Sequence, residues 1–281
     1  MIIGKLKVSV LIMTQNEESN IPSALESVVG DFDQVIVVDS YSIDKTKDIC
    51  LSYKGIDFYE NDFQGWAEQR NWMLKNCNIK NNIVFFLDAD EWVDSDFIME
   101  LSGIIKSKNE FSAIYLKVKF LFLNKWLKYS YGHPKIKRIF NKNQLYFSGE
   151  GAREYAHIDE EKSISMNCYL IHQDRRSFDH WVKKHLSNAD REASLYIKLA
   201  NEKRDNNRND LSFKLRFKLF IRHRLWNIIP LGVRPFFYFL YRYFLQLGFL
   251  DGKRGFLYCV NHALWYQMLI DIKIIEGSGD E

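Results

Sequence analysis

Cysteine is scarce in this chain of 281 residues, and no two cysteines form a Cys-x-x-Cys pair. The four cysteines are Cys50, Cys77, Cys168 and Cys259, widely separated along the chain. This pattern gives no disulfide framework and argues against metal ligation by cysteine. We therefore expect each thiol to fill a buried position, in a protein that works in a reducing compartment.

Long uncharged apolar runs are also missing. The nearest approach to a membrane span, Gly255 to Ile270, is interrupted by three polar residues. The apolar run at the N-terminus lacks a small-residue cleavage site and leads directly into Thr14 to Glu17, which predicts a first β-strand and not a signal peptide. The chain has no HExxH motif, no GxGxxG after that strand and no defensible Ser/His/Asp order.

The composition is that of a globular protein. Hydrophobic residues make up 47% and charged residues 27% of the chain, while the formal net charge is only +3. The length fits one large domain or one domain with an appendage. The net charge excludes no class of partner. Only the distribution of charge along the chain can indicate what the protein binds.

Strand-like and helix-like segments alternate in the first third of the chain. The expected strands are Val8 to Met13, Val35 to Val38, Ile56 to Tyr59 and Ile83 to Leu87. Helices are expected after Asn20 and Ser42, each serving as an N-cap, and over Gly65 to Asn76. Strands that are apolar on both faces and alternate with helices predict an α/β fold with a parallel sheet.

Polar residues follow three of these strands: Thr14 to Glu17, Asp39 to Ser42 and Asp88 to Glu91. Ligands of open α/β sheets bind beyond the carboxyl ends of the strands. We therefore expect the three clusters to converge on one crevice.

The pattern changes after the fourth strand. Ala113 to Leu123 alternates apolar and polar residues, which predicts a half-buried and antiparallel strand. Arg138 to Phe140 and Leu145 to Phe147 are expected as short strands beside a turn, and Ser177 is expected to cap a long helix. Asn201 to Asp210 has the composition of a solvated linker. We expect a catalytic domain over residues 1–175 and a helical region over residues 176–281.

Asp88 and Asp90 stand two residues apart in "FFLDADEW". On an extended segment the two carboxylates point the same way and can hold one hard cation, Mg²⁺ or Mn²⁺, which also binds phosphate oxygens. Such an ion neutralises the charge of a departing diphosphate. The alternative is an acidic surface turn without a ligand.

Seven segments in order carry a family resemblance: "VSVLIMTQNEESNIPSALESV", "VIVVDSYSIDKT", "GWAEQRN", "FFLDADEWV", "KIKRIF", "GEGAREY" and "IHQDRRSFDHWVKKH", with "LGFLDGKRGF" after them. The first four resemble motifs of the family 2 inverting glycosyltransferases, which have the GT-A fold. The later ones resemble the bacterial lipopolysaccharide inner-core β-1,4-glucosyltransferases. The resemblance covers most of the chain.

The resemblance implies roles at matching positions. Thr14, Asn16, Glu17, Asp39, Arg70 and Arg138 fall where the family contacts the nucleotide sugar. Asp88 and Asp90 match its DXD motif, with Asp90 as the direct metal ligand, and Glu91 as a neighbour of that site. His172 falls where some members carry a polar residue that touches metal or diphosphate, although a lone His after an apolar run is commonly structural.

Inversion by direct displacement needs a base opposite the leaving group. The resemblance favours Glu154, and Glu150 is the alternative. The branch has Val-His-Glu here, whereas this chain has Arg153 before the glutamate. An arginine at that position can pair with a phosphate or with Glu154, which would lower the pKa of Glu154.

The segment Leu211 to Leu250 has no acidic residue. Its cations are Lys214, Arg216, Lys218, Arg222, Arg224, Arg234 and Arg242, and many large aromatic residues lie between them. This composition suits the headgroup layer of an anionic membrane. It does not favour nucleic acid, because no nucleic-acid motif accompanies it. The alternative is a pair of helices that cover the sheet domain, with long cationic side chains lying over them.

The sequence therefore predicts an inverting, metal-dependent hexosyltransferase. The resemblance implies UDP-glucose as donor and a heptose of a lipid-anchored lipopolysaccharide or lipooligosaccharide core as acceptor, at the cytoplasmic face of the bacterial inner membrane. A peptide or polyprenyl phosphate acceptor, a phosphoryl-transfer enzyme and a non-catalytic glycan- or membrane-binding protein are the alternatives. A phosphoryl-transfer enzyme of the Asp-x-Asp kind would need its nucleophile on the first strand, where Met13, Thr14 and Gln15 stand.

Overall fold

The computed structural model describes residues 4–107, 110–132, 134–143, 145–150, 153–202 and 229–278. The chain forms two compact units. The first comprises Met1–Trp126 and His133–Arg176, and the second comprises Leu127–Gly132 and Ser177–Glu281. The segment Leu127–Gly132 thus belongs with the C-terminal region, although the sequence placed residues 1–175 in one domain.

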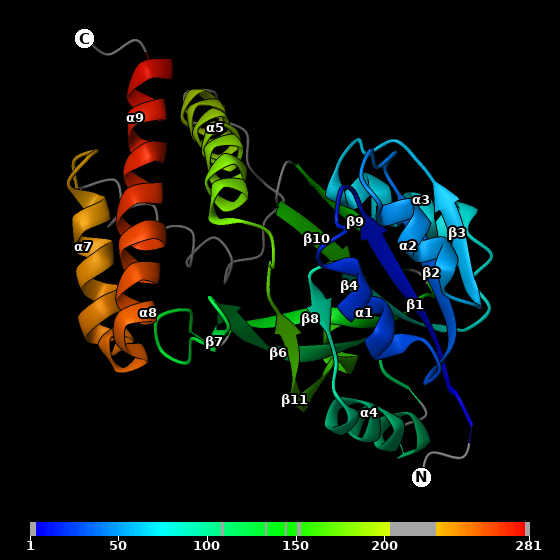
Figure 1. Ribbon diagram of the computed structural model, residues 1–281. Coiled ribbons are helices and arrows are strands. Elements are labelled where there is room, and N and C mark those ends of the chain that lie inside the picture. Colours follow the sequence, from blue (N-terminus) through cyan, green and yellow to red (C-terminus); the bar gives the residue numbers. More distant parts are fainter. Residues whose placement is uncertain are drawn as a thin grey trace. The chain divides into compact units, whose positions relative to one another are not determined.

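Four parallel strands form one half of the main sheet in the first unit (Figure 1). They are β1 (Leu6–Thr14), β2 (Phe32–Asp39), β3 (Ile56–Glu60) and β4 (Ile83–Asp88), in the order β3-β2-β1-β4. The predicted parallel sheet is confirmed. In the register of the strands, Thr14 lies opposite Asp39 and Met13 lies opposite Asp88, so the polar clusters that follow the strands are level with one another.

The other half of the sheet contains strands of both directions. β8 (Lys135–Asn141) runs antiparallel to β4, and β6 (Ala113–Phe122), β11 (Ile164–His172) and β5 (Glu91–Trp92) follow. The predicted strand at 113–123 is antiparallel to β8 but parallel to β11. Because β8 opposes β4, the first residues of β8 lie at the same edge of the sheet as Asp88.

The second predicted short strand belongs to a different sheet. β9 (Tyr146–Glu150) pairs with β10 (Arg153–His157) in a separate hairpin, while the two-residue strand β7 (Lys125–Trp126) pairs with β6. The hairpin lies beside α3, because Asn71 of that helix exchanges two hydrogen bonds with the backbone of Phe147.

The sheet is buried on both faces. Val8, Val10 and Ile12 of β1 lie in one apolar cluster, and Leu11 and Met13 lie in the other. The helices of this unit are α1 (Ile21–Val28), α2 (Thr46–Ser52), α3 (Trp66–Asn76), α4 (Ser95–Ser107) and the short 3₁₀ turn η1 (Glu160–Lys162). Burial of both faces explains why these strands read as continuous apolar runs.

Two of the predicted helix caps are wrong, and the third is confirmed. The side chains of Asn20 and Ser42 do not cap α1 and α2, and α2 begins only at Thr46. Asn20 bonds instead to Glu17, Asp174 and Arg175, and the Ser42 hydroxyl bonds to Asp39 and Asn16. Ser177 does cap its helix, since its hydroxyl accepts a hydrogen bond from the backbone N–H of His180 at 3.2 Å.

The second unit is helical, as predicted (Figure 1). Its elements are α5 (Phe178–Glu202), α7 (Arg234–Leu240), η2 (Tyr241–Leu245), η3 (Gly248–Asp251), α8 (Gly252–Tyr258), η4 (Cys259–Trp265) and α9 (Tyr266–Ser278). Within the described residues, no helix combines the length and the apolar character needed to cross a bilayer. Three cysteines are buried as expected, whereas Cys168 is only partly buried. Most of the predicted linker, Asn201 to Asp210, lies outside the described residues.

Two of the cations expected at a membrane surface are buried inside this unit. Arg234 is paired with Asp271, and Arg242 donates to the backbone carbonyl of Ser130 from its Nε at 2.9 Å. The membrane-surface role expected of these two arginines is therefore wrong, because both guanidinium groups are buried and bonded to other residues of the protein. The five cations from Lys214 to Arg224 lie outside the described residues.

Asp251 fastens the segment before Gly132 to the helices of the second unit. Its carboxylate accepts hydrogen bonds from the backbone N–H groups of Lys128, Tyr129 and Ser130, and from the hydroxyl of Ser130 at 2.6 Å. The residue is only 3% exposed, so its charge is stabilised by these donors and not by water.

We expect Asp251→Asn to lower the free energy of unfolding by about 2–4 kcal/mol, because an amide turns N–H donors toward backbone N–H groups. Urea denaturation measures the change. The control is Asp48→Asn on the exposed face of α2, for which a change within about 0.5 kcal/mol is expected. Equal stability of the two variants would contradict this role of Asp251.

Candidate active site

The loops that follow β1 and β2 are held together by hydrogen bonds at the carboxyl edge of the sheet. The carboxylate of Asp39, which is fully buried, accepts from the backbone N–H of Ser42 at 2.7 Å and from its hydroxyl at 2.5 Å. The same hydroxyl accepts from the backbone N–H of Asn16 at 2.8 Å. Asn16 and Tyr41 have φ values of 54° and 52°, in the left-handed region. Such conformations are sparsely populated and concentrate at ligand sites.

The predicted nucleotide-contacting residues of these loops have different surroundings. The amide oxygen of Asn16 accepts from the backbone N–H of Ile43 at 2.9 Å, so it holds the loops together. The hydroxyl of Thr14 is buried without a hydrogen-bond partner among the described residues. A buried hydroxyl that lacks a protein partner is available to a ligand.

Two arginine side chains lie against the carboxylate of Asp88. Its carboxylate is paired with Arg138 and lies 3.5 Å from Nη2 of Arg70. Burial alone would raise the pKa of Asp88, but Arg138 and Arg70 outweigh that effect and hold the pKa below its usual range. Asp88 is therefore ionised and ready to act as an acceptor or a ligand.

Arg70 is the most deeply buried of these groups, with a side chain only 2% exposed. Its guanidinium lies 4.9 Å from the ring centre of Phe86 and 5.5 Å from that of Phe147. Its Nε is 2.9 Å from the Oε2 atom of Glu154. The helix α3, the strand β4 and the hairpin β9–β10 thus meet around one buried cation.

Glu154 is brought to the site by β10 although it lies far from Asp88 in the sequence. Burial raises its pKa above the usual value, while Arg70 and Arg138 act in the opposite direction. Arg70 therefore lies between Glu154, whose pKa is raised, and Asp88 of the DXD segment. The side chain of the alternative base, Glu150, lies outside what the structure describes, as does that of Arg153.

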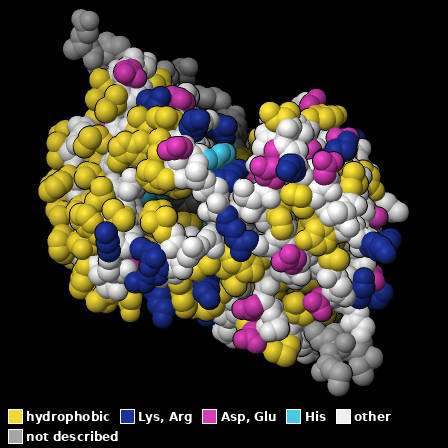
Figure 2. All heavy atoms as spheres, in the orientation of Figure 1, with side chains coloured by type: hydrophobic (Ala, Val, Ile, Leu, Met, Phe, Trp, Pro, Cys, Tyr) yellow, Lys and Arg dark blue, Asp and Glu magenta, His cyan; other side chains and the backbone are white. Residues whose placement is uncertain are grey.

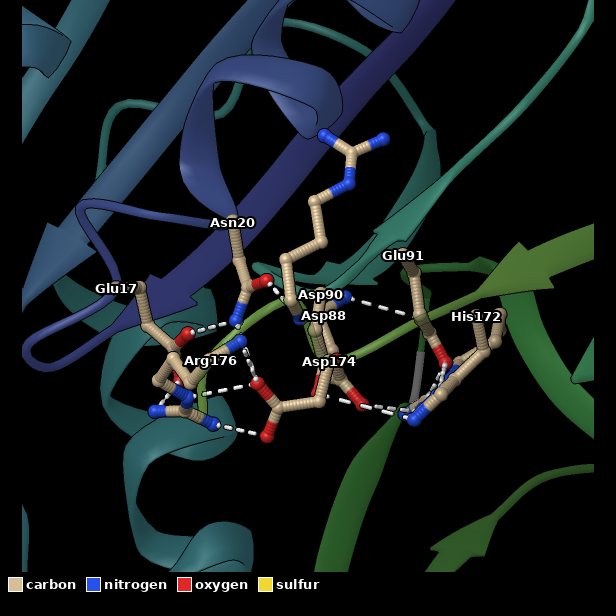
Figure 3. A network of polar contacts seen from close by, with 10 residues as sticks. Glu17, Asn20, Asp88, Asp90, Glu91, His172, Asp174 and Arg176 are labelled. Carbon is tan, nitrogen blue, oxygen red and sulfur yellow. Dashed lines mark hydrogen bonds and ion pairs between the residues drawn. The ribbon is translucent and has the colours of Figure 1, made fainter. Parts of the chain in front are cut away.

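The carboxylate of Asp90 lies close to His172 of β11. Its Oδ2 atom is 3.8 Å from Nε2 of His172, whose other ring nitrogen is 3.7 Å from Glu91 (Figure 3). Burial alone would lower the pKa of His172, but Asp90 and Glu91 raise it to about 9. Glu91 is nearly inaccessible and also pairs with Arg138 at 3.0 Å, so it ties the two halves of the cluster together.

The side chains at this edge could supply only part of the ligands of a cation, and the rest would come from water and phosphate oxygens. Among the described residues, no three His, Cys, Asp or Glu side chains are grouped so that they could hold a metal ion. Asp90 and His172 offer an oxygen and a nitrogen that face each other, which suits an ion completed by water and phosphate oxygens. A metal at His172 competes with the proton that its raised pKa favours.

The segment that follows His172 was among the segments that carry the family resemblance, but no role was assigned to its Asp174 or Arg176. Asp174 accepts from the amide of Asn20 at 3.1 Å and forms a two-point pair with Arg176, whose guanidinium also lies 2.8 Å from Glu17 (Figure 3). The backbone N–H of Gln173 donates to the carbonyl of Asp90 at 2.9 Å. The signal was present in "HQDRR", a run of polar residues directly after a strand.

The predicted site residues gather at one edge of the first unit. These are Thr14, Asn16, Glu17, Asp39, Arg70, Asp88, Asp90, Arg138, Glu154 and His172. Their individual roles remain predictions. The fold is that of an α/β protein, a class in which ligands bind beyond the carboxyl ends of the parallel strands.

A family model described as Glycosyl transferase family 2 matches residues 9–152, which is half of the chain, and the protein belongs to that family. An uncharacterized glycosyltransferase of Rickettsia bellii is 32% identical over 141 residues, covering 50% of this chain and 46% of the relative. An uncharacterized glycosyltransferase of Rickettsia typhi is 32% identical over 117 residues, covering 42% of this chain and 39% of the relative. The chain thus spans less than half the length of these curated relatives.

Among solved structures, S. aureus TarS 1-349 in complex with UDP-GlcNAc superposes with a TM-score of 0.51. The sequence identity is 16%, and the match covers 97% of this chain and 92% of that one. The likeness shows the fold, and the predicted GT-A fold is confirmed.

Proposed function

We propose that this protein is an inverting, metal-dependent glycosyltransferase that moves a hexose from a nucleotide sugar, glucose from UDP-glucose, to an acceptor hydroxyl. Family membership supports the reaction class, and the structural neighbour in complex with UDP-GlcNAc supports a UDP-sugar donor. The observation that carries the proposal is the cluster in which Arg70 joins Asp88 to Glu154. It sets a candidate base beside carboxylates and cations suited to a nucleotide diphosphate.

The residues after β1 and β2 hold the donor in this proposal. Asp39, fixed by Ser42, receives the uridine, and the buried hydroxyl of Thr14 supplies a further contact. A divalent ion held by Asp90 and His172, and completed by water and phosphate oxygens, would supply charge neutralisation to the leaving diphosphate, while Asp88, also expected as a ligand, is paired with Arg138 and Arg70. Arg138 has an Nε without a hydrogen-bond partner among the described residues, which suits a phosphate oxygen.

Glu154 takes the proton from the acceptor hydroxyl, whose oxygen then forms the new bond to the anomeric carbon. The bond between that carbon and the diphosphate oxygen breaks, and the diphosphate leaves with the electron pair. Arg70 holds the Glu154 carboxylate in place at 2.9 Å. Attack from the face opposite the leaving group gives inversion.

For the acceptor we propose a heptose of a lipid-anchored lipopolysaccharide or lipooligosaccharide core. The support is the resemblance of "KIKRIF", "GEGAREY" and "IHQDRRSFDHWVKKH" to the inner-core glucosyltransferases. Such an acceptor places the enzyme at the cytoplasmic face of a bacterial inner membrane.

An exposed apolar surface on the second unit supports contact with that membrane. Hydrophobic side chains gather over α7, α8 and α9, with Lys and Arg side chains beside them (Figure 2). The exposed residues of α7 to α8 include Phe236, Phe237, Tyr241, Phe244, Leu245, Phe249, Leu250 and Phe256, each more than 40% exposed. Aromatic rings beside cations suit the interface of an anionic bilayer.

We expect Phe236→Ser combined with Phe237→Ser to weaken binding to vesicles with phosphatidylglycerol by about tenfold or more, because two large side chains no longer enter the bilayer. Vesicle sedimentation measures this. The control is Met99→Ser on α4, which is 57% exposed on the first unit and should leave binding unchanged. Binding that is equal for wild type and the double variant would reject this surface as the membrane contact.

A donor screen tests the reaction class. We expect purified protein with Mn²⁺ and cell-envelope lipid extract to release UDP from UDP-glucose, and chelation with EDTA to reduce the release to background. GDP-mannose serves as the control donor. Unchanged release in EDTA would contradict metal dependence, and no release from any UDP-sugar would contradict the proposed function.

A further inference from the structure

A groove of about 400 Å³ opens beside the candidate base. Glu154 and Tyr155 of β10 line one side, and Lys135, Lys137 and Arg138 of β8 line the other, with Tyr115 of β6 and Glu160 of η1. The groove lies entirely within the first unit. Glu154 and Arg138 thus belong both to the groove and to the cluster around Asp88.

The strands β6 and β8 turn their lysines to the same face of the sheet. Ile114, Leu116 and Ile136 pack in or against the core, so the alternate residues point the other way. In the antiparallel register, Tyr115 lies opposite Lys137 and Lys117 lies opposite Lys135. Two lysines that face each other across a strand pair repel.

Carboxylates lie near most of these cations, including Glu100 near Lys117. Lys137 is paired with Glu160 and lies 5.2 Å from the ring centre of Tyr115. Arg138 is paired with Asp88 and Glu91. Lys135 is exposed and forms no ion pair with any described residue, and Lys117 lies over the ring of Tyr169 at 5.8 Å. Among the described residues that line the groove, Lys135 is therefore a cation that an anionic group of a ligand can still pair with.

We propose that this groove is the acceptor site and that the acceptor carries an anionic group, a phosphate or a carboxylate, held by Lys135, which lines the groove. This inference rests on the proposed function, because it takes Glu154 as the base. The anion lies at the lysine end of the groove, and the reacting hydroxyl lies at the Glu154 end. The groove therefore selects a sugar by a negative charge that is remote from the hydroxyl that reacts.

Glucose 6-phosphate, glucuronate and glucose serve as probes, in titration calorimetry with saturating UDP and Mn²⁺ so that the donor site is filled. We expect the two anionic sugars to bind about tenfold or more tightly than glucose. Lys135→Glu should weaken their binding at least about tenfold, Lys135→Arg should retain it, and glucose should be unaffected by either change.

The matched control is Lys54→Glu, a similarly exposed lysine before β3, for which binding should stay within about twofold. Comparison of the phosphate with the carboxylate shows which anion the groove prefers. Equal affinities for glucose and both anionic sugars would overturn the proposal, as would a loss in Lys54→Glu as large as in Lys135→Glu. A phosphate sugar that binds only when UDP is omitted would show that the anion enters the donor site, which also overturns it.

The same titrations separate this inference from the proposed function. UDP binding that depends on Mn²⁺, together with no preference for an anionic sugar, rejects the groove and leaves the donor site standing. Absence of UDP binding rejects the proposed function itself.

Discussion

Asp90→Asn is expected to reduce sugar transfer by about a thousandfold or more, while the fold stays intact. The amide has nearly the shape of the carboxylate but lacks the charge that holds a divalent ion, and charge neutralisation of the leaving group is worth several kcal/mol. Asp90 is 8% exposed and faces His172, so few other groups can replace it. Initial rates of UDP release with saturating Mn²⁺ measure the loss.

Asp96→Asn is the matched control, since Asp96 is exposed in the first turn of α4 and contacts no residue of the site. Its rate should stay within about twofold of wild type. Thermal denaturation checks that both variants fold. Turnover in Asp90→Asn close to that of Asp96→Asn would remove Asp90 from the reaction.

Glu154→Gln is expected to lower transfer by about a hundredfold to ten-thousandfold, because glutamine accepts no proton. UDP binding should persist, since Asp39 and the residues after β4 remain. Calorimetry with UDP and Mn²⁺ measures binding beside the rate assay. The control is Glu161→Gln in the exposed turn η1, with a rate near wild type. Loss of UDP binding in Glu154→Gln would assign this residue to the donor site instead.

The rate of the wild-type enzyme should also fall as the pH falls through the raised pKa of Glu154. A base must be ionised to work, and burial moves that pKa above the ordinary value of 4.5. The acid limb of the rate profile should therefore lie above pH 4.5. An acid limb at or below the ordinary value would mean that the ionisation of a buried Glu154 does not control the rate.

The sequence predicted the parallel half of the sheet because its strands are buried on both faces and end in polar residues. Thr14, Asp39 and Asp88 could be assigned to one edge before any register was known, since parallel strands bring their carboxyl ends together. The helix α4 was missed, although its apolar residues Phe97, Ile98 and Leu101 are buried.

The side-chain partners could not be predicted, because they join residues that are far apart in the sequence. The acidic end of β4 suggested a metal ion beside Asp88, and the structure adds two cations that the sequence did not reveal, Arg70 and Arg138. Asn20 and Ser42 have good capping chemistry, yet their side chains accept hydrogen bonds from the backbone N–H groups of Arg175 and Asn16 in neighbouring loops. Tertiary contacts overrode the local preference in each case.

A crystal structure of the protein with UDP and Mn²⁺ tests the central claim most directly. The account predicts the ion in contact with Asp90, the diphosphate between the ion and Arg138, and the uracil or ribose beside Asp39. A ligand bound elsewhere, or UDP at this edge without any ion at Asp90, would contradict it.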